Sequence, residues 1–396
     1  MEVGEGIGAG VTTAIEKRTI ALTKPLIGEA EADAARRPIM SGWITQGPEV
    51  AAFEQEFATY TGAAHAVAVS NCTTALHLAL LAVGVGDGDE VITVSHSYVA
   101  TANAIRYCNA TPVFVDVDPA TSNLNPSLIA PAITSRTKAI LTVHQMGMPC
   151  DMAAILSIGR THGVPVIEDA ACASGSEICI DGQWDKVGKA HGDITCFSFH
   201  PRKVITTGDG GMLTTNNAAY DAQFRLLRQH GMNVSDRVRH NANDVIFEDH
   251  LVIGYNYRLT DIQAAVGREQ LKRLPGIVVA RRRLADRYRE LLAGIPGIVF
   301  AHEPAWARSN WQSFWIRLPA ARGQREVMQA MLDRGVATRR GIMCSHREAP
   351  YLRSGGYRLP LSEQAQDRNI ILPLYPQMTE DEQMYVCTML HEVLDD

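Results

Sequence analysis

The sequence lacks a long hydrophobic run and an excess of positive charge. Among its 396 residues no run of about eighteen apolar residues occurs, which excludes a membrane-spanning helix. The formal net charge is -6, whereas nucleic-acid-binding surfaces are normally basic. The N-terminus also lacks the basic-then-apolar order of a secretory signal. We therefore expect a cytoplasmic protein without a membrane or nucleic-acid partner.

Metal-binding and dinucleotide-binding motifs are missing as well. None of the eight cysteines forms a CxxC pair, which argues against zinc, so we expect no metal site. Most of them are expected to be buried, reduced thiols. No GxGxxG motif follows the first predicted strands, which argues against a nicotinamide-dependent oxidoreductase.

Short apolar runs alternate with helical patterns between residues 49 and 215. Several runs are β-branched and continuous, as in strands that are buried on both faces of a parallel sheet. They lie at residues 65–70, 91–94, 112–117, 139–143, 164–167 and 195–199, and the helical patterns at 49–60, 73–83, 100–108 and 152–161. This alternation predicts an α/β domain in which helices flank a mostly parallel sheet.

A change of pattern predicts a second domain, as the length of 396 residues also does. A helix is expected to begin at Thr260, to break near Pro275 and to resume to about residue 293. A strand at 313–318 and a helix at 324–334 then predict a smaller C-terminal α+β domain. We divide the chain into a flexible N-terminal extension (1–20), a large domain (21–270) and a small domain (271–396).

Two residues at the ends of predicted strands indicate the chemistry. Lys203 stands between the strand that ends at Phe199 and a loop with three glycines at 208–211, and Asp169 follows the apolar run 164–167. An amine that bonds an aldehyde and a carboxylate beside a pyridinium nitrogen are the protein groups that pyridoxal 5'-phosphate (PLP) chemistry requires. Burial or a nearby cation is expected to lower the lysine pKa. Taken alone, Lys203 could be a solvated loop lysine and Asp169 the cap of a turn.

Eight motifs in a fixed order carry a resemblance to a known family. They are SGWITQGPEVAAFE, SNCTTALHLAL, SYVATANAI, PVFVDVD, VIEDAA, CFSFHPRKVITTGDGGM, LRQHG and GYNYRLTDIQAAVG. From about residue 22 to 394 the chain resembles the DegT/DnrJ/EryC1/StrS family of fold-type I, PLP-dependent sugar aminotransferases. The resemblance implies that Lys203 forms the Schiff base with PLP and moves a proton between substrate and cofactor carbons. It also implies that Asp169 keeps the pyridine ring protonated.

The same resemblance implies a phosphate site at a helix N-terminus. The N–H groups and hydroxyls of Cys72, Thr73 and Thr74 would bind the phosphate, because a helix N-terminus attracts anions. Ser198 would add a hydroxyl group. The alternative for the threonines is an ordinary helix cap, and Cys72 replaces the glycine that the family usually has.

Three further positions concern the cofactor ring and a second subunit. By resemblance, Tyr98 stacks on the ring, although it could instead be a core aromatic. Asn256 matches an asparagine that reaches the neighbour's phosphate, which implies a homodimer with shared active sites; its alternative is a polar turn. Cys172 departs from the family, which often has glutamine or histidine near the cofactor's 3-oxygen, and offers only a weak S–H donor.

Other charged candidates carry less weight. His200 and His230 are interpreted as packing or hydrogen-bonding residues, whereas His144 follows a strand where substrate could enter. Arg281–Arg283 are expected on a solvated helix face. Arg339 and the arginine after it could bind a nucleotide diphosphate through charge-assisted hydrogen bonds.

The residues favour an aminotransferase. Lys203 argues against the sugar dehydratase branch of the family, which carries histidine at that position. We expect an amino donor, glutamate or glutamine, and a keto-sugar acceptor, with a nucleotide-linked keto-deoxyhexose as the leading class. The alternatives are a keto-cyclitol (inosose-type) aminotransferase and a non-catalytic PLP-binding regulator.

Overall fold

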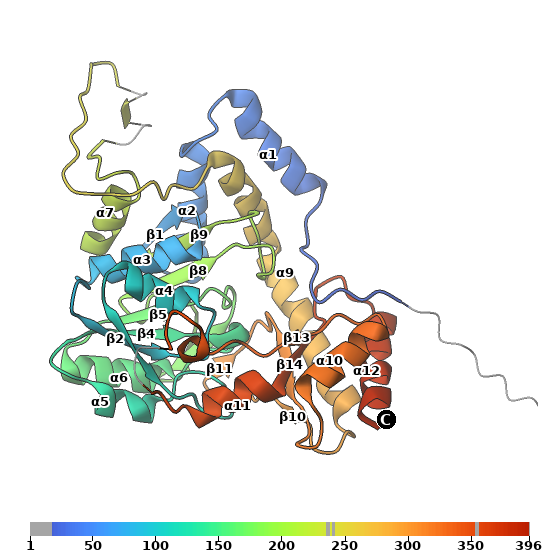
Figure 1. Cartoon of the computed structure of the whole chain (residues 1–396). Helices are drawn as coiled ribbons and strands as arrows, with labels where there is room; N and C mark the ends of the chain where they lie inside the picture. Colours follow the sequence, from blue (N-terminus) through green and yellow to red (C-terminus); the bar gives the residue numbers. More distant parts are fainter. Residues whose placement is uncertain (1–17, 235–237, 240–241, 353–355, 396) are drawn as a thin grey trace, which may run out of the picture.

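The computed structural model describes residues 18–234, 238–239, 242–352 and 356–395. Residues 1–17 of the expected N-terminal extension lie outside these ranges. Figure 1 shows a larger lobe around a central sheet and a smaller lobe that contains the C-terminus. The helix α9 runs along both lobes.

A seven-stranded sheet forms the centre of the larger lobe (Figure 1). β9 pairs antiparallel with both of its neighbours, and the other pairs are parallel. In spatial order the strands are β1 (His65–Val69), β9 (Gly211–Thr215), β8 (Ile194–Ser198), β5 (Val166–Asp169), β4 (Thr137–Val143), β2 (Glu90–Val94) and β3 (Thr111–Val115). The predicted mostly parallel sheet is confirmed.

Helices cover both faces of this sheet because successive strand residues point to opposite sides. In β1, Ala66 and Ala68 lie in one core with residues of α2 and α6, whereas Val67 and Val69 lie in another with residues of α3 and α7. The bounds are α2 (Pro48–Thr61), α3 (Cys72–Ala82), α4 (Ala100–Tyr107), α5 (Ile129–Ala132), α6 (Met152–His162) and α7 (Ala218–Leu227). The large part is therefore an α/β layered fold, as predicted.

The smaller lobe has its own sheet and core. Four antiparallel-paired strands lie in the order β10 (Val299–Phe300), β12 (Phe314–Arg317), β14 (Asn369–Leu372) and β13 (Arg339–Arg340). A separate core cluster unites this sheet with α10 (Gln324–Asp333), α12 (Glu380–Asp395) and the end of α9. Ile20 belongs to that cluster and bridges to Val336, so the described N-terminal residues pack against the C-terminal part.

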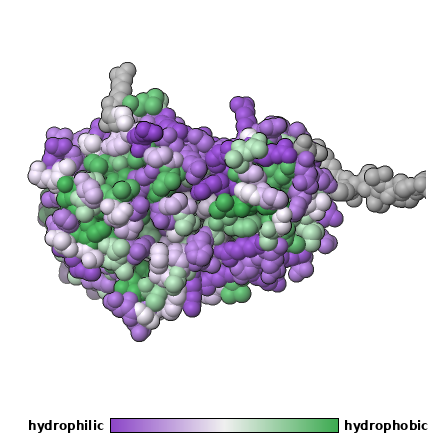
Figure 2. Space-filling model, turned by 90° about the horizontal axis from the view of Figure 1, so that it is seen from below, coloured by the Kyte–Doolittle hydropathy of each residue, from purple (hydrophilic) through white to green (hydrophobic). Residues whose placement is uncertain are grey.

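The remaining elements connect or cover these two parts. A small sheet joins β11 to β6 and β6 to β7. The bounds are α1 (Glu29–Ser41), η1 (Pro126–Leu128), η2 (Gln145–Gly147), β6 (Glu177–Ile180), β7 (Gln183–Lys186), β11 (Ala307–Arg308), η3 (Ser345–Arg347) and α11 (Pro360–Arg368). The face in Figure 2 shows apolar patches among polar residues on both lobes, which is ordinary for a protein surface.

The expected break near Pro275 is wrong, because α9 is continuous from Asp261 to Leu292. Its start is as predicted: the Thr260 hydroxyl accepts the Gln263 N–H at 3.2 Å. A proline inside a helix costs roughly 3 kcal/mol. Buried neighbours such as Leu274 pack on the large core and offset that cost. A domain boundary at residue 270 would fall inside this helix, and it stays a proposal.

The solvated-face interpretation is wrong for Arg281, which is fully buried in α9. Its Nη1 donates to the carbonyl oxygens of Trp311, at 3.1 Å, and Leu374, at 3.2 Å. Burial lowers the pKa of Arg281 to about 10. The guanidinium group therefore ties the long helix to two loops of the smaller lobe.

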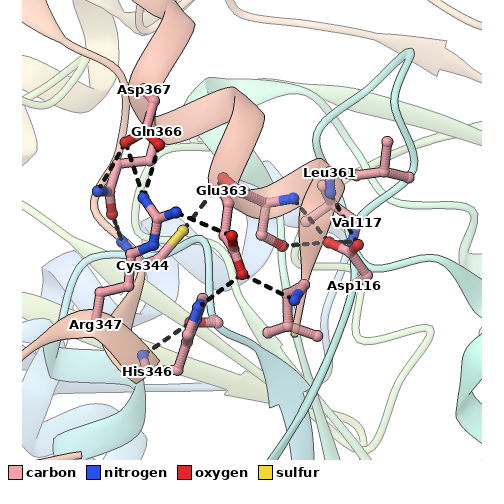
Figure 3. Close-up of polar contacts among 12 residues, drawn as sticks. Asp116, Val117, Cys344, His346, Arg347, Leu361, Glu363, Gln366 and Asp367 are labelled. Atoms are coloured by element: carbon pink, nitrogen blue, oxygen red, sulfur yellow. Dashed lines mark hydrogen bonds and ion pairs between the residues drawn. The ribbon is translucent and has the colours of Figure 1, made fainter. Parts of the chain in front are cut away.

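Polar contacts join the two lobes next to α11 (Figure 3). The Asp116 carboxylate, beyond β3, accepts the N–H groups of Leu361 at 3.0 Å and Ser362 at 2.7 Å. It thereby caps the first turn of α11, whose N–H groups have no partner within the helix. Ser95, beyond β2, lies 2.6 Å from Nδ1 of His346. Strand ends of the large sheet are thus fixed to the smaller lobe.

Candidate active site

The predicted site residues gather where parallel strands end. Asp169 and Ser198 are the last residues of β5 and β8, Cys72 begins the helix after β1, and Tyr98 lies between β2 and α4. All four strands point the same way, because β9 is antiparallel to both β1 and β8. Ligands of open α/β sheets bind at this carboxyl edge.

Lys203 is directed into this edge. Its Nζ lies 3.2 Å from the sulfur of Cys172, and its N–H donates to the His200 carbonyl oxygen at 2.8 Å. The loop then folds back, since Thr207 donates its N–H to the Phe199 carbonyl at 3.0 Å. This position disfavours the solvated-loop alternative for the lysine.

The pKa of Lys203 is raised, contrary to the expected lowering. Burial favours the neutral amine and acts to lower the pKa, but Cys172, Cys72 and Asp169 together outweigh it. Cys172 makes the largest of these opposing contributions, by charge and by hydrogen bond. The expected lowering fails because the groups closest to the amine are potential anions and not cations.

Asp169 is buried and held by neutral donors. Its Oδ2 accepts the Thr101 hydroxyl at 2.8 Å, and its Oδ1 accepts the Ala171 N–H at 3.1 Å. Ser97 lies 2.8 Å from the same threonine hydroxyl. Burial raises the pKa of Asp169, and the Thr101 hydrogen bond opposes that rise. A buried carboxylate with neutral donors can accept a cationic N–H.

The sequence left open whether His144 lies at a substrate entrance, and its burial shows that it does not. The ring is fully buried, and its Nε2 donates to Glu168 Oε2 at 2.9 Å. Its Nδ1 accepts the Cys150 N–H at 3.0 Å. Burial alone would raise the pKa of Glu168, but the hydrogen bond from His144 lowers it. This pair supports the strand behind Asp169, because Glu168 and Asp169 point to opposite faces.

The first turn of α3 begins at the carboxyl edge of the sheet, and Thr74 has a structural partner there. Asn71 caps the helix by accepting the Thr74 N–H at 2.9 Å, and the Thr74 hydroxyl donates to the Asn71 carbonyl at 2.7 Å. The N–H groups of Cys72 and Thr73 are among the first of the helix, which have no partner within it.

Glycine allows β9 to approach this turn closely. A Cβ atom at Gly211 would lie 2.5 Å from the Asn71 carbonyl, so no side chain fits there. Ser198 ends β8 next to it and is paired with Gly211. The Cys72 side chain lies in the core, so this residue offers its N–H group to the turn.

Tyr98 and Asn256 are both exposed. The core-aromatic alternative for Tyr98 is wrong, since the residue is 64% exposed. In the sequence Asn256 stands between Tyr255 and Tyr257, whose rings stack on each other with centroids 4.9 Å apart. The Tyr257 carbonyl accepts the Ser70 N–H at 2.8 Å, which places this segment beside the entry to α3.

The remaining candidates lie toward the surface. His200 and His230 are exposed, and His230 has a positive φ of 63°. Arg339 and Arg340 are exposed on β13. Burial lowers the pKa of Arg339, the charge of Arg202 adds to this, and Tyr98 and Cys172 oppose it. Arg339 is therefore within electrostatic reach of the site.

Sequence reasoning missed two residues that hold the site together. Thr101 bonds Asp169, and Asn310 donates its side-chain amide to the carbonyl oxygens of Cys172 and Ser174 at 2.8 and 2.9 Å. Thr101 stands inside the SYVATANAI motif, so its position within a matched motif was the available signal. Asn310 comes from a loop of the smaller lobe, and no local pattern marks it.

These residues fit PLP. The amine of Lys203, the buried carboxylate of Asp169 and the α3 N-terminus, where Gly211 leaves no room for a Cβ, offer groups for its aldehyde, ring nitrogen and phosphate. In the described ranges no cluster of three metal-binding side chains occurs. No helix found there combines the length and apolarity needed to cross a bilayer.

Comparison with known proteins agrees with this site. The sequence profile of the DegT/DnrJ/EryC1/StrS aminotransferase family matches residues 25–391. The fold and the site therefore define a fold-type I, PLP-dependent aminotransferase. The chain belongs to the DegT/DnrJ/EryC1/StrS aminotransferase family, whose structural neighbours here are sugar aminotransferases.

Three similar proteins illustrate the family. The spore coat polysaccharide biosynthesis protein SpsC of Bacillus subtilis is 38% identical over 90% of this chain and 92% of its own length. The aminotransferase TlmJ from Streptoalloteichus hindustanus is 34% identical, with a TM-score of 0.87 over 96% of this chain and 99% of its own. DesI, solved in the presence of its TDP-sugar product, is 29% identical, with a TM-score of 0.86 over 96% and 94% of the two chains.

Proposed function

We propose that this aminotransferase moves an amino group from glutamate or glutamine to a nucleotide-linked keto-deoxyhexose. One observation supports the aminotransferase chemistry: Lys203, Asp169 and the α3 N-terminus lie at the same edge of the sheet. The sugar class is supported by family membership, by the similarity to SpsC and by the TDP-sugar in the DesI structure. The exposed arginines Arg339 and Arg340 add positive charge near the site for a diphosphate group.

Each residue has a role that its position supports. Bound PLP supplies an aldehyde and an electron-withdrawing ring. Lys203 would hold the aldehyde carbon and later carry the proton that moves at the substrate carbon. Asp169, held by Thr101, would keep the ring nitrogen protonated.

Other side chains would bind the rest of the cofactor. The N–H groups of Cys72 and Thr73, with the hydroxyls of Thr73 and Ser198, would bind the phosphate at the start of α3. Thr74 would act mainly through the cap that it forms with Asn71. The exposed ring of Tyr98 is available to cover the cofactor ring.

A homodimer with shared active sites is part of the proposal. Val245, Phe247 and Ile253 are 85%, 87% and 89% exposed in the segment that precedes Asn256. This segment leaves the larger lobe next to α7 (Figure 1). Exposed apolar residues in a group mark interaction surfaces. We take the partner to be a second copy, to whose phosphate site Asn256 would add a side-chain amide.

The substrate class is tested in two separate half-reactions. The PLP-loaded enzyme is incubated with single amino acids, and loss of the visible cofactor band identifies the donor. The aminated enzyme is then offered TDP- and UDP-linked keto-deoxyhexoses and free inososes, and mass spectrometry detects the aminated product. Return of the band with a nucleotide sugar supports the proposal. Return with inososes alone would replace it by the keto-cyclitol alternative.

A further inference from the structure

The thiol that contacts the reactive lysine is unusual for this chain. Among the described residues, six of the eight cysteines are buried, and only Cys172 and Cys179 are partly exposed. Cys179 lies in β6 of the small sheet. Cys172 lies in the turn after β5, and its sulfur is 3.2 Å from Nζ of Lys203. The described structure therefore gives the lysine amine a sulfur partner.

The position of this sulfur is fixed from both lobes. Asp169, three residues earlier, is bonded to Thr101, and the Cys172 carbonyl accepts the Asn310 side-chain amide at 2.8 Å. Asn310 is itself restricted, since a Cβ atom at Gly147 would lie 2.0 Å from its Oδ1. Contacts from both lobes thus hold the backbone of the turn that carries the thiol. The sulfur therefore lies at a defined position beside the lysine amine.

We infer that Cys172 is a positioning residue that accepts a hydrogen bond from the free Lys203 amine and retains a proton on it. This inference rests on the proposed PLP function and concerns the steps in which the lysine is not bonded to the cofactor. The groups that act electrostatically on the amine are Cys172, which contacts it, Cys72 at the start of α3, and Asp169 at the end of β5. His200, in the lysine's own loop, also interacts electrostatically with it.

The raised pKa of Lys203 agrees with this role. Burial acts to lower that pKa, and Cys172 contributes most to the opposite effect. Sulfur is a weak hydrogen-bond acceptor in water. The same hydrogen bond is stronger in a buried site, where the amine has few other partners. Cys172 thus favours the protonated form of this lysine.

Retention of this proton should affect the rate at which the cofactor-free site binds PLP covalently. The protonated amine must first lose its proton to solvent. Its nitrogen then bonds the aldehyde carbon, and the aldehyde oxygen leaves as water. Only the neutral amine reacts, so below its pKa the capture rate rises about tenfold for each unit by which the pKa falls. Removal of the sulfur should therefore shift the pH profile of capture toward lower pH.

The test compares the wild-type protein with Cys172→Ala and Cys172→Ser, each freed of cofactor. Stopped-flow absorbance measures the rate of PLP capture across pH, and the lysine-bound cofactor is verified by borohydride reduction and mass spectrometry. We expect Cys172→Ala to capture PLP several-fold faster at pH values below the wild-type midpoint. Cys172→Ser, which keeps an acceptor, should move the profile back toward wild type. Identical profiles in all three proteins would overturn the inference.

Two controls separate this inference from the proposed function. If Lys203→Ala still captures PLP covalently, the proposed function of the lysine fails, whatever Cys172 does. If only the wild-type and Cys172 variants capture PLP, that function stands and the profiles alone decide the role of the thiol. Should Cys172→Ala not fold, Cys172→Val removes the acceptor and fills the space of the thiol with a slightly larger apolar side chain.

Discussion

The hydroxyl of Thr101 offers a sharp test of how Asp169 is held. The variant Thr101→Val keeps the shape of the side chain and removes the donor that lies 2.8 Å from Asp169 Oδ2. A hydrogen bond to a charged group contributes about 1.5–3 kcal/mol, whereas one between neutral groups contributes about 0.5–1.5 kcal/mol. The residue is buried, so water does not readily replace the lost donor.

The pH dependence of this loss follows from the pKa of Asp169. Burial raises that pKa above its usual value of 3.8 in the folded protein. Ionisation of Asp169 therefore opposes folding, and this cost appears as the pH rises from the usual value through the raised one. Thr101 reduces the cost because it bonds the charged carboxylate. Its removal should cost about 1.5–3 kcal/mol at neutral pH and about 0.5–1.5 kcal/mol in acid.

The assay is equilibrium urea unfolding of the cofactor-free protein at neutral and acidic pH. Thr101→Ser is the matched control, since it keeps the hydroxyl and should retain most of the wild-type stability. In the PLP-loaded Thr101→Val enzyme, the acid limb of activity should move to higher pH, because Asp169 becomes protonated more easily. Equal losses at both pH values, or an equal loss in Thr101→Ser, would refute the reasoning.

Three further predictions follow from the site, the proposed dimer and the lobe junction. Inactive Lys203→Ala and Asn256→Ala homodimers should regain activity when their subunits are mixed and exchanged, and verified exchange without recovery would count against shared sites. Phe247→Asp should weaken self-association in analytical ultracentrifugation, because it places a charge on an apolar surface that is 87% exposed, and an unchanged dimer would contradict the proposed interface. Asp116→Ala should destabilise the protein by about 0.5–2 kcal/mol through loss of the α11 cap, with Asp116→Asn as the milder control in thermal unfolding.

The sheet could be predicted from the sequence because its strands are buried on both faces. Continuous β-branched runs such as residues 139–143 and 91–94 match β4 and β2 closely. β9 was not predicted, since Gly211 begins it and glycine disfavours a strand. Its glycine is required by the backbone of the adjacent Asn71, which no local pattern reveals.

The errors share a physical cause, namely burial that is created only by tertiary contacts. Pro275 normally breaks a helix, but the packing of its neighbours on the large core holds α9 together. From the sequence, Arg281 is expected at the surface. The carbonyl groups that accept its hydrogen bonds in the core come from loops about 30 and 93 residues away. His144 likewise finds Glu168, 24 residues later. A single sequence shows the charge of such residues but not the partners that permit their burial.

The site residues were easier to find than their supports for a related reason. Asp169 ends a strand and Lys203 follows one, and the ends of parallel strands converge in space whatever the intervening helices are. Thr101 and Asn310 fix the geometry from a helix and from the other lobe, so their importance depends on the assembled fold. The position of Cys172 after β5 can be predicted from the sequence. Its contact with Lys203 cannot, because that contact depends on how the loop of residues 199–207 folds back. The residues proposed for the chemistry can therefore be predicted from strand ends, whereas the contacts that position them depend on the assembled tertiary structure.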